Sequence, residues 1–225
     1  IMSKETKALT INPQLAAFQE ELLKSYDKAN LSAKKGQTLF VGSSLMEIFP
    51  IEKWEEAGEV TFSHYIYNRA VRATTTSFLL EHIESQIFNL EPSKIFINIG
   101  TNDIGFEIPE DEFLNNYDQI LSQIESKLPQ TQVYVMRYYP INTVDFGQDS
   151  DEKTLFETRS NEKFQKASDK IKKLADNHHF HFIDVNDGLS DENGNLKKEL
   201  TFDGAHLNPA GYQLVLENLK VYLEE

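Results

Sequence analysis

The sequence contains no cysteine. This absence excludes disulfide bonds, thiolate metal sites and thiol catalysis. Basic residues are scarce as well, because 22 Lys and Arg face 36 Asp and Glu, which gives a net charge of −14. Nucleic-acid binding depends on neutralising phosphates, and the chain has no Lys/Arg-rich run. We therefore expect neither nucleic acids nor anionic membrane surfaces as partners.

Long apolar runs are also missing. No stretch of about 18 apolar residues occurs, so the sequence predicts no membrane-spanning helix. The first residues, IMSKETKALTINPQ, lack the apolar centre of a signal peptide, which favours a cytoplasmic protein. The 225 residues suit a single domain (1–225), with residues 1–35 as an N-terminal helical segment packed on it.

Five short apolar or aromatic segments are typical of strands buried on both faces. They are residues 38–42, 61–67, 94–100, 132–139 and 180–185. Apolar residues at helical spacing lie between them, and Asn208-Pro209 has the composition of a helix start. The alternation predicts an α/β fold with a parallel sheet and helices on both faces. Residues 141–153 are irregular and are predicted to be a loop that covers the site.

Reactive residue types follow several of these strands, where open α/β sheets bind ligands. The first strand ends in Gly-Ser-Ser (42–44) and the third in Gly-Thr-Asn-Asp (100–103), while Asp203 and His206 precede the last helix. A histidine activates a serine hydroxyl and a carboxylate sets the histidine tautomer. A side-chain amide and backbone N–H groups stabilise the oxyanion that forms in acyl transfer.

Each motif also has a simpler interpretation. Gly-Ser-Ser before a helix is, taken alone, most often a turn with a helix cap. Gly-Thr-Asn-Asp is most often a polar turn, because Asn and Asp bond their own backbone. A lone Asp-x-x-His is weak evidence. The prediction depends on finding all three in order at the expected strand ends.

Together these motifs resemble those of the SGNH, or GDSL, hydrolase superfamily of esterases and lipases. Residues 42–45 (GSSL) correspond to its Gly-Asp-Ser-Leu block, residues 100–103 match Gly-x-Asn-Asp, and residues 203–206 match Asp-x-x-His. LFVGSSLMEIF, YNRAVRATTT and FDGAHLNPAGY look most like the platelet-activating-factor acetylhydrolase α-subunit group. The resemblance implies a three-layer α/β/α fold whose five-stranded parallel sheet has the flavodoxin-like strand order 2-1-3-4-5.

The resemblance also implies roles for individual residues. Ser44 would be the nucleophile, His206 the general base and Asp203 its orienting carboxylate. The oxyanion hole would consist of the N–H groups of Ser44 and Ala73 and the amide of Asn102. The family needs no metal and no cofactor, and its members often pair, so a homodimer is a reasonable expectation.

The second motif block departs from the family pattern. Asn-Arg-Gly-Ile-Gly-Gly-Asp-Thr-Thr is replaced here by NRAVRATTT (68–76), so Ala73 occupies the donor position. If φ must be positive there, alanine is strained by about 1 kcal/mol or more. Arg72 either binds an acidic substrate group or is an ordinary solvated side chain. Tyr138 and Tyr139 follow the fourth strand and either line a substrate pocket or pack internally.

Two other features were weighed as sites. His178, His179 and His181 invite a metal interpretation, but no partner at ligand spacing is evident. The acidic run 149–152 lacks the glycine and the later glutamate of an EF-hand. A flavodoxin-like cofactor binder is disfavoured because neither G-x-G-x-x-G nor a P-loop is present.

The sequence therefore predicts a serine esterase that cleaves a short-chain, most simply acetyl, O-acyl ester of a small molecule. One alternative is a carbohydrate or peptidoglycan O-acetylesterase, which applies the same chemistry to another alcohol. The other is a weakly active or non-catalytic binding protein of the same fold. The lost glycines and Ser43, which stands where the family has Asp, motivate that last alternative.

Overall fold

At the centre of the computed structural model, which describes residues 12–225 but not the side chains of residues 150 and 151, lies a parallel sheet of five strands. Its order is β2-β1-β3-β4-β5, and all four neighbouring pairs are parallel, so the predicted 2-1-3-4-5 arrangement is confirmed. The strands are β1 (Thr38–Gly42), β2 (Ile66–Asn68), β3 (Lys94–Asn98), β4 (Gln132–Met136) and β5 (His181–Ile183).

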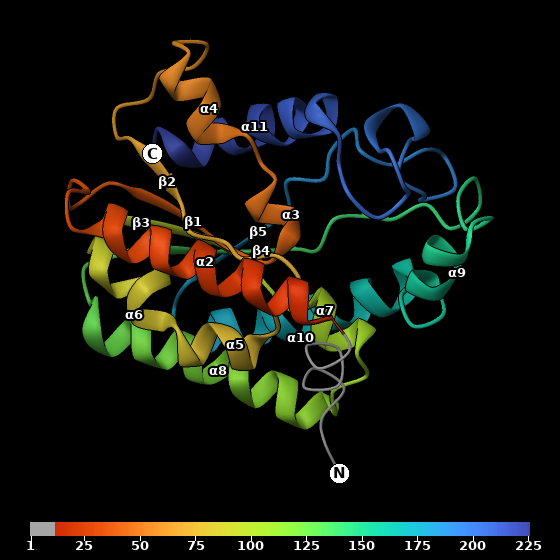
Figure 1. Cartoon of the computed structure of the whole chain (residues 1–225), viewed down its shortest axis with the longest axis horizontal. Coiled ribbons are helices and arrows are strands. Elements are labelled where there is room, and N and C mark those ends of the chain that lie inside the picture. The colour runs from red at the N-terminus through yellow and green to blue at the C-terminus, as the bar shows by residue number, and fades with distance from the viewer. Residues whose placement is uncertain (1–11) are drawn as a thin grey trace.

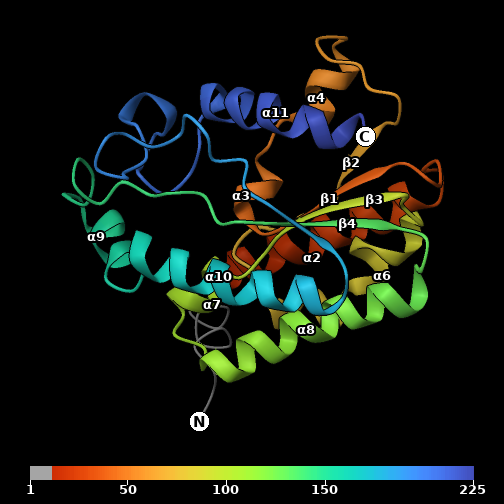
Figure 2. The same ribbon diagram turned by 180° about the vertical axis from the view of Figure 1, so that it is seen from behind.

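Helices lie on both faces of this sheet and give a three-layer α/β/α arrangement (Figures 1 and 2). One face carries α5 (Thr76–Glu81), α6 (Ile83–Gln86), α8 (Glu110–Lys127) and α10 (Asn161–Asn177). The other carries α3 (Ser44–Glu47), α4 (Ile51–Glu56) and α11 (Pro209–Leu223). The remaining helices are α2 (Pro13–Asn30), α7 (Thr101–Gly105) and α9 (Ser150–Phe156), with short 3₁₀ turns η1 (Phe88–Leu90) and η2 (Lys198–Leu200).

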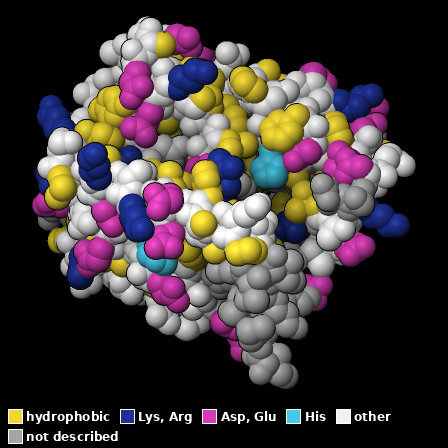
Figure 3. Space-filling model, in the orientation of Figure 1, with side chains coloured by type: hydrophobic (Ala, Val, Ile, Leu, Met, Phe, Trp, Pro, Cys, Tyr) yellow, Lys and Arg dark blue, Asp and Glu magenta, His cyan; other side chains and the backbone are white. Residues whose placement is uncertain are grey.

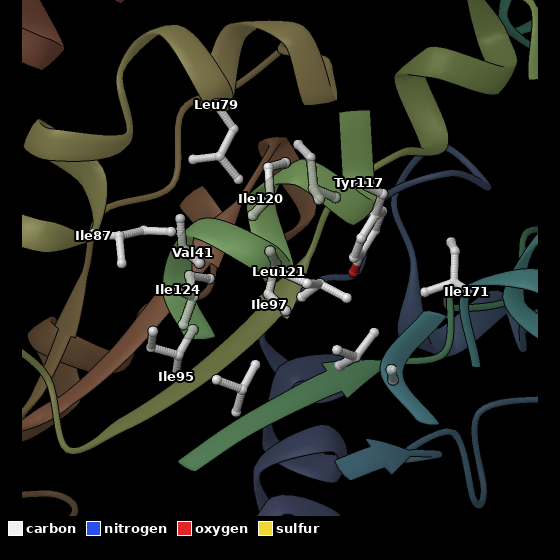
Figure 4. Packing of buried hydrophobic residues seen from close by; sticks show 14 of the residues in the cluster. Val41, Leu79, Ile87, Ile95, Ile97, Tyr117, Ile120, Leu121, Ile124 and Ile171 are labelled. Atoms are coloured by element: carbon white, nitrogen blue, oxygen red, sulfur yellow. The ribbon is translucent and has the colours of Figure 1, made fainter. Parts of the chain in front are cut away.

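Strand residues alternate between two apolar cores. Val41 and Ile97 face α8, where they meet Leu121 and Ile124 (Figure 4). Their neighbour Phe40 belongs to the opposite cluster with α3, α4 and α11. Because both faces are covered, the central strands β1, β3 and β4 consist largely of apolar residues. Each fully buried apolar side chain contributes about 1.5–3 kcal/mol of hydrophobic stabilisation.

Several predicted elements differ from the structure. The strands predicted over 94–100, 132–139 and 180–185 are the shorter β3, β4 and β5. The second strand was expected over 61–67 but is β2 (Ile66–Asn68), because at the sheet edge only this part pairs with β1. The predicted irregular loop 141–153 is shorter, since α9 begins at Ser150. Asp149 caps this helix by accepting a 2.8 Å hydrogen bond from the Glu152 N–H. Its acidic run is therefore partly a helix start, a signal that we missed.

The helix α2 packs on α6 and on the segment after β2. The Gln19 amide donates to the Arg72 carbonyl at 2.8 Å, and the Tyr26 hydroxyl donates to the Ala70 carbonyl at 2.6 Å. Residues 1–11 of the predicted N-terminal segment lie outside the described residues. Between residues 12 and 225, no helix combines the length and apolarity needed to cross a membrane.

Candidate active site

Ser44 occupies the first position of α3, directly after β1. The turn depends on Gly42, since a Cβ there would lie 2.1 Å from the Asn98 carbonyl oxygen of the neighbouring strand. Ser43 holds the N-cap position, yet its side chain makes no capping hydrogen bond. The two serines therefore do more than start a helix, because they place Ser44 at the carboxyl edge of the sheet.

Ser44, His206 and Asp203 form one connected chain of side chains. Ser44 Oγ lies 3.3 Å from His206 Nε2, and His206 Nδ1 lies 2.6 Å from Asp203 Oδ2. The contact with Asp203 favours a proton on Nδ1, which leaves Nε2 free to accept the serine proton. The ring of Phe202 stacks parallel on the imidazole, with centroids 5.8 Å apart.

The Asp203 carboxylate is held by its own turn. Its Oδ1 accepts backbone hydrogen bonds from Ala205 at 2.9 Å and His206 at 2.8 Å. Partial burial alone would raise the pKa of Asp203, but the bond and charge of His206 together with these N–H groups hold that pKa below its usual value. The carboxylate is thus anionic at neutral pH, as an orienting group must be.

Three candidate donors belong to residues that line the cavity at Ser44. They are the N–H groups of Ser44 and Ala73, neither of which has an acceptor among the described residues, and the Asn102 amide. Ala73 has a φ of +59°, so the strained alternative foreseen for this position is the one adopted. Asp103 fixes the segment by accepting from the Thr76 N–H at 3.0 Å and its hydroxyl at 2.7 Å.

The orientation of the Asn102 amide is set by two neighbours. Its Nδ2 donates to the Thr74 carbonyl at 2.9 Å, while its Oδ1 accepts from Arg159 at 2.9 Å. The second Nδ2 hydrogen is left for a ligand. Arg159 was not foreseen, since it lies between α9 and α10 in a stretch without any motif. Burial lowers the pKa of its guanidinium to about 10.

These groups line a cavity of about 540 Å³. Its walls include α9 and the turn after it, so residues near the predicted covering loop do border the site. A smaller pocket of about 40 Å³ adjoins this cavity beside Ser44, and its lining includes Ile141, Phe164 and Ala205. A larger groove of about 660 Å³ near Trp54 and α11 contains none of these residues.

Arg72 also borders the cavity, but its charge is already neutralised. Arg72 donates to both carboxylate oxygens of Glu47, from Nε to Oε1 at 3.2 Å and from Nη2 to Oε2 at 2.6 Å. The Phe18 ring centre lies 4.2 Å from the guanidinium carbon. Arg72 is therefore neither a free receptor for an anion nor an ordinary solvated side chain, the two roles expected for it. The side chain is a structural ion pair.

Tyr138 and Tyr139 do not line the cavity, contrary to one of the two expectations. They are 2% and 1% exposed. The Tyr138 hydroxyl donates to the Ile99 carbonyl at 2.7 Å, and the Tyr139 hydroxyl lies 3.7 Å from the Met46 sulfur. Both rings turn into the layers on either side of the sheet. Both side chains pack internally. A position just after a strand does not determine which way a side chain points, which is why the sequence left both interpretations open.

The histidine-rich segment forms no metal cluster in the part of the chain that the structure describes, where no group of three His, Asp or Glu could hold an ion. His178 instead contacts Asp118, with Nε2 at 2.6 Å from Oδ1. On the face shown in Figure 3, Lys and Arg side chains are scattered among Asp and Glu and form no basic patch.

Comparison with known proteins agrees with this geometry. The GDSL-like Lipase/Acylhydrolase family matches residues 40–214. The chain belongs to this family. It is thereby placed among the carboxylic ester hydrolases, and the predicted resemblance is confirmed.

Individual relatives extend the match. A solved structure from Streptococcus pneumoniae, provisionally named a platelet activating factor, is 33% identical and has a TM-score of 0.83, with 97% of this chain and 98% of that one covered. The isoamyl acetate-hydrolyzing esterase of Saccharomyces cerevisiae is 26% identical over 161 residues, which are 65% of this chain and only 62% of that protein. An acetylxylan esterase from Geobacillus stearothermophilus, solved as a catalytic mutant, shares the fold at 14% identity and a TM-score of 0.62, covering 84% and 94% of the two chains.

Proposed function

We propose that this protein is a serine esterase that hydrolyses short-chain O-acyl esters, acetates above all, through an acyl-Ser44 intermediate. The observation that carries the proposal is the chain of contacts from Ser44 through His206 to Asp203, at 3.3 Å and 2.6 Å. Apo geometry of this kind is close enough to tighten in a substrate complex. The substrate would be a small-molecule ester, and no cofactor takes part.

The reaction would proceed in two halves. Ser44 Oγ attacks the ester carbonyl as His206 Nε2 takes its proton, and the oxyanion receives hydrogen bonds from Ser44, Ala73 and Asn102. The alcohol leaves with the proton from His206. Water, deprotonated by the same imidazole, then attacks the acyl-serine and restores the hydroxyl.

The small pocket beside Ser44 supports a short acyl group. Its volume of about 40 Å³ is much smaller than the roughly 540 Å³ of the main cavity, so it suits a small group such as an acetyl methyl. The acetate esters in the names of the yeast and Geobacillus relatives point the same way. The acetylxylan relative keeps a carbohydrate O-acetylester as the second candidate substrate.

The test compares the two adjacent serines. We expect Ser44→Ala to lower 4-nitrophenyl acetate hydrolysis by about 10³-fold or more, as the loss of a nucleophile does, and to abolish labelling by a fluorophosphonate. Ser43→Ala is the matched control and should still be labelled. A panel of 4-nitrophenyl esters should show activity falling from acetate to hexanoate, and acetylated xylan and peptidoglycan should be assayed beside it.

The non-catalytic alternative gives the opposite result. An unlabelled wild-type protein with intact folding would show that Ser44 is not activated, and the strained Ala73 would then be the first place to look. Turnover that survives in folded Ser44→Ala protein would refute the assignment of the nucleophile.

A further inference from the structure

Arg159 differs from the other arginines of the chain. The sequence has four arginines, at 69, 72, 137 and 159, and the first three each lie within 4.0 Å of a carboxylate. Among the described residues, Arg159 has no such partner, although the chain carries 36 acidic residues. Its recorded hydrogen bonds go to the Asn102 amide oxygen and, at 3.4 Å, to the Leu155 carbonyl. A guanidinium offers five N–H donors, so part of its capacity is unused.

The position of this unpaired charge is defined by the fold. Its guanidinium rests on Gly105 of α7, where an added Cβ would lie 2.0 Å from the Arg159 Cζ. The Phe106 ring lies 5.8 Å from the same carbon. Arg159 borders both the main cavity and the small pocket beside Ser44. A half-buried cation is therefore fixed next to the nucleophile, with N–H groups available to whatever enters.

A buried charge is costly unless it is paired, and arginine matches planar anions through two parallel hydrogen bonds. Among the described residues, no carboxylate lies within 4.0 Å of Arg159, whereas Glu47 neutralises Arg72, which borders the same cavity. We propose that Arg159 binds an anionic oxygen group, a carboxylate or a phosphate, carried by the ester substrate. This inference rests on the proposed esterase function and narrows it to esters of acidic molecules.

The test compares acidic with neutral acetates. The neutral ester is methyl 4-acetoxybenzoate, and the acidic ones are 4-acetoxybenzoate and 4-acetoxyphenyl phosphate; 4-nitrophenyl succinate places the carboxylate on the acyl side. For each, kcat/KM is measured in the wild type and in Arg159→Gln. We expect the ratio of kcat/KM for an acidic ester to kcat/KM for the neutral ester to be about tenfold or more lower in Arg159→Gln than in the wild type, for at least one acidic ester. This is the size of effect expected from a lost charge-assisted hydrogen bond. The ester that responds identifies the group.

Two variants serve as controls. Arg159→Lys keeps the charge without the planar fork and should retain part of the preference. Lys166→Gln removes the same charge from the exposed face of α10, and it should leave the ratio unchanged. If Arg159→Gln slows acidic and neutral esters equally, Arg159 acts only by orienting Asn102, and the proposal is wrong.

Binding is measured separately from catalysis. Ligand-observed NMR follows 4-acetoxybenzoate and 4-acetoxyphenyl phosphate on Ser44→Ala protein, with and without Arg159→Gln. We expect affinity to weaken about tenfold without the arginine. Equal affinities would overturn the proposal even if the wild type hydrolyses every ester. Arginine-dependent binding without any hydrolysis or fluorophosphonate labelling would overturn the esterase function instead and keep the anion site.

Discussion

Ala73 holds a backbone conformation that suits glycine better than alanine. Its φ of +59° lies in the left-handed region, where a Cβ crowds the following carbonyl. Ala73 nevertheless lines the cavity beside Ser44, and its N–H has no acceptor among the described residues. The segment between β2 and α5 thus keeps a donor in place at a local energetic cost of about 1–2 kcal/mol.

Replacing Ala73 by glycine should remove this strain. We expect Ala73→Gly to raise the free energy of unfolding by up to about 1 kcal/mol, because the relief of strain exceeds the extra chain entropy of glycine. Urea unfolding measures the change, and esterase activity should be retained.

Ala70→Gly is the matched control in the same segment. Ala70 is fully buried and has no positive φ, so its replacement should destabilise the fold. A destabilised Ala73→Gly variant would show that the alanine methyl group makes contacts worth more than the strain.

At the scale of elements, α2 packs on the loop that carries Ala73, the proposed second oxyanion donor. Gln19 and Tyr26 bind the carbonyl groups of Arg72 and Ala70, which lie immediately before and three residues before Ala73. Both carbonyls would otherwise be partly buried without a donor. The N-terminal helix therefore belongs to the structural support of the site, although it lies outside the matched family region, which begins at residue 40.

Removing one of these bonds should loosen the loop. We expect Tyr26→Phe to lower the free energy of unfolding by about 1–2 kcal/mol and to reduce kcat more than it changes KM, since the donor acts mainly on the transition state. Ser25→Ala, on the exposed side of the same helix, is the control. A change in stability without any change in kcat would limit α2 to a structural role.

The layers of the fold could be predicted from the sequence, because buried parallel strands leave strong apolar patterns. The residues of the three motif blocks could be predicted as well, because their spacing within each block is short. Asp203 and His206 are three residues apart, so one turn brings their side chains together. Arg159 meets Asn102 across 57 positions through helix packing that no local pattern encodes. Tyr138 and Tyr139 do lie just beyond the fourth strand, as the sequence predicted, but the direction of their side chains depends on tertiary packing.

At the scale of the whole molecule, the stability of the fold depends on pH through its many carboxyl groups, since the chain has 36 Asp and Glu. Glu55 packs beneath β2 and accepts a 2.7 Å hydrogen bond from the Ile66 N–H. Burial raises the pKa of Glu55 to about 7, with a smaller contribution from the nearby charges of Glu52 and Glu56. The folded protein therefore holds this proton more tightly than the unfolded chain does.

The sign of the pH effect follows from this shift. The stabilising contribution of Glu55 is complete below about pH 4.5 and is lost as the pH rises through about 7. We expect Glu55→Gln to narrow the difference in melting temperature between about pH 5 and pH 8. Glu59→Gln is the control, because Glu59 is exposed and is not among the charges that act on Glu55. An unchanged difference would contradict the buried-proton assignment. We also expect one cooperative transition, as a single domain over residues 1–225 requires.

The amide of Asn102 joins the Thr74 carbonyl on one side to the Arg159 guanidinium on the other. An anion that engages Arg159 competes for the same donors that orient this amide, so recognition of substrate charge and stabilisation of the oxyanion share one hydrogen-bonded link. Their energies are then coupled and do not add. A substitution at Arg159 that changes which esters bind should therefore also change the rate of the chemical step, and a substitution at Asn102 should change charge recognition.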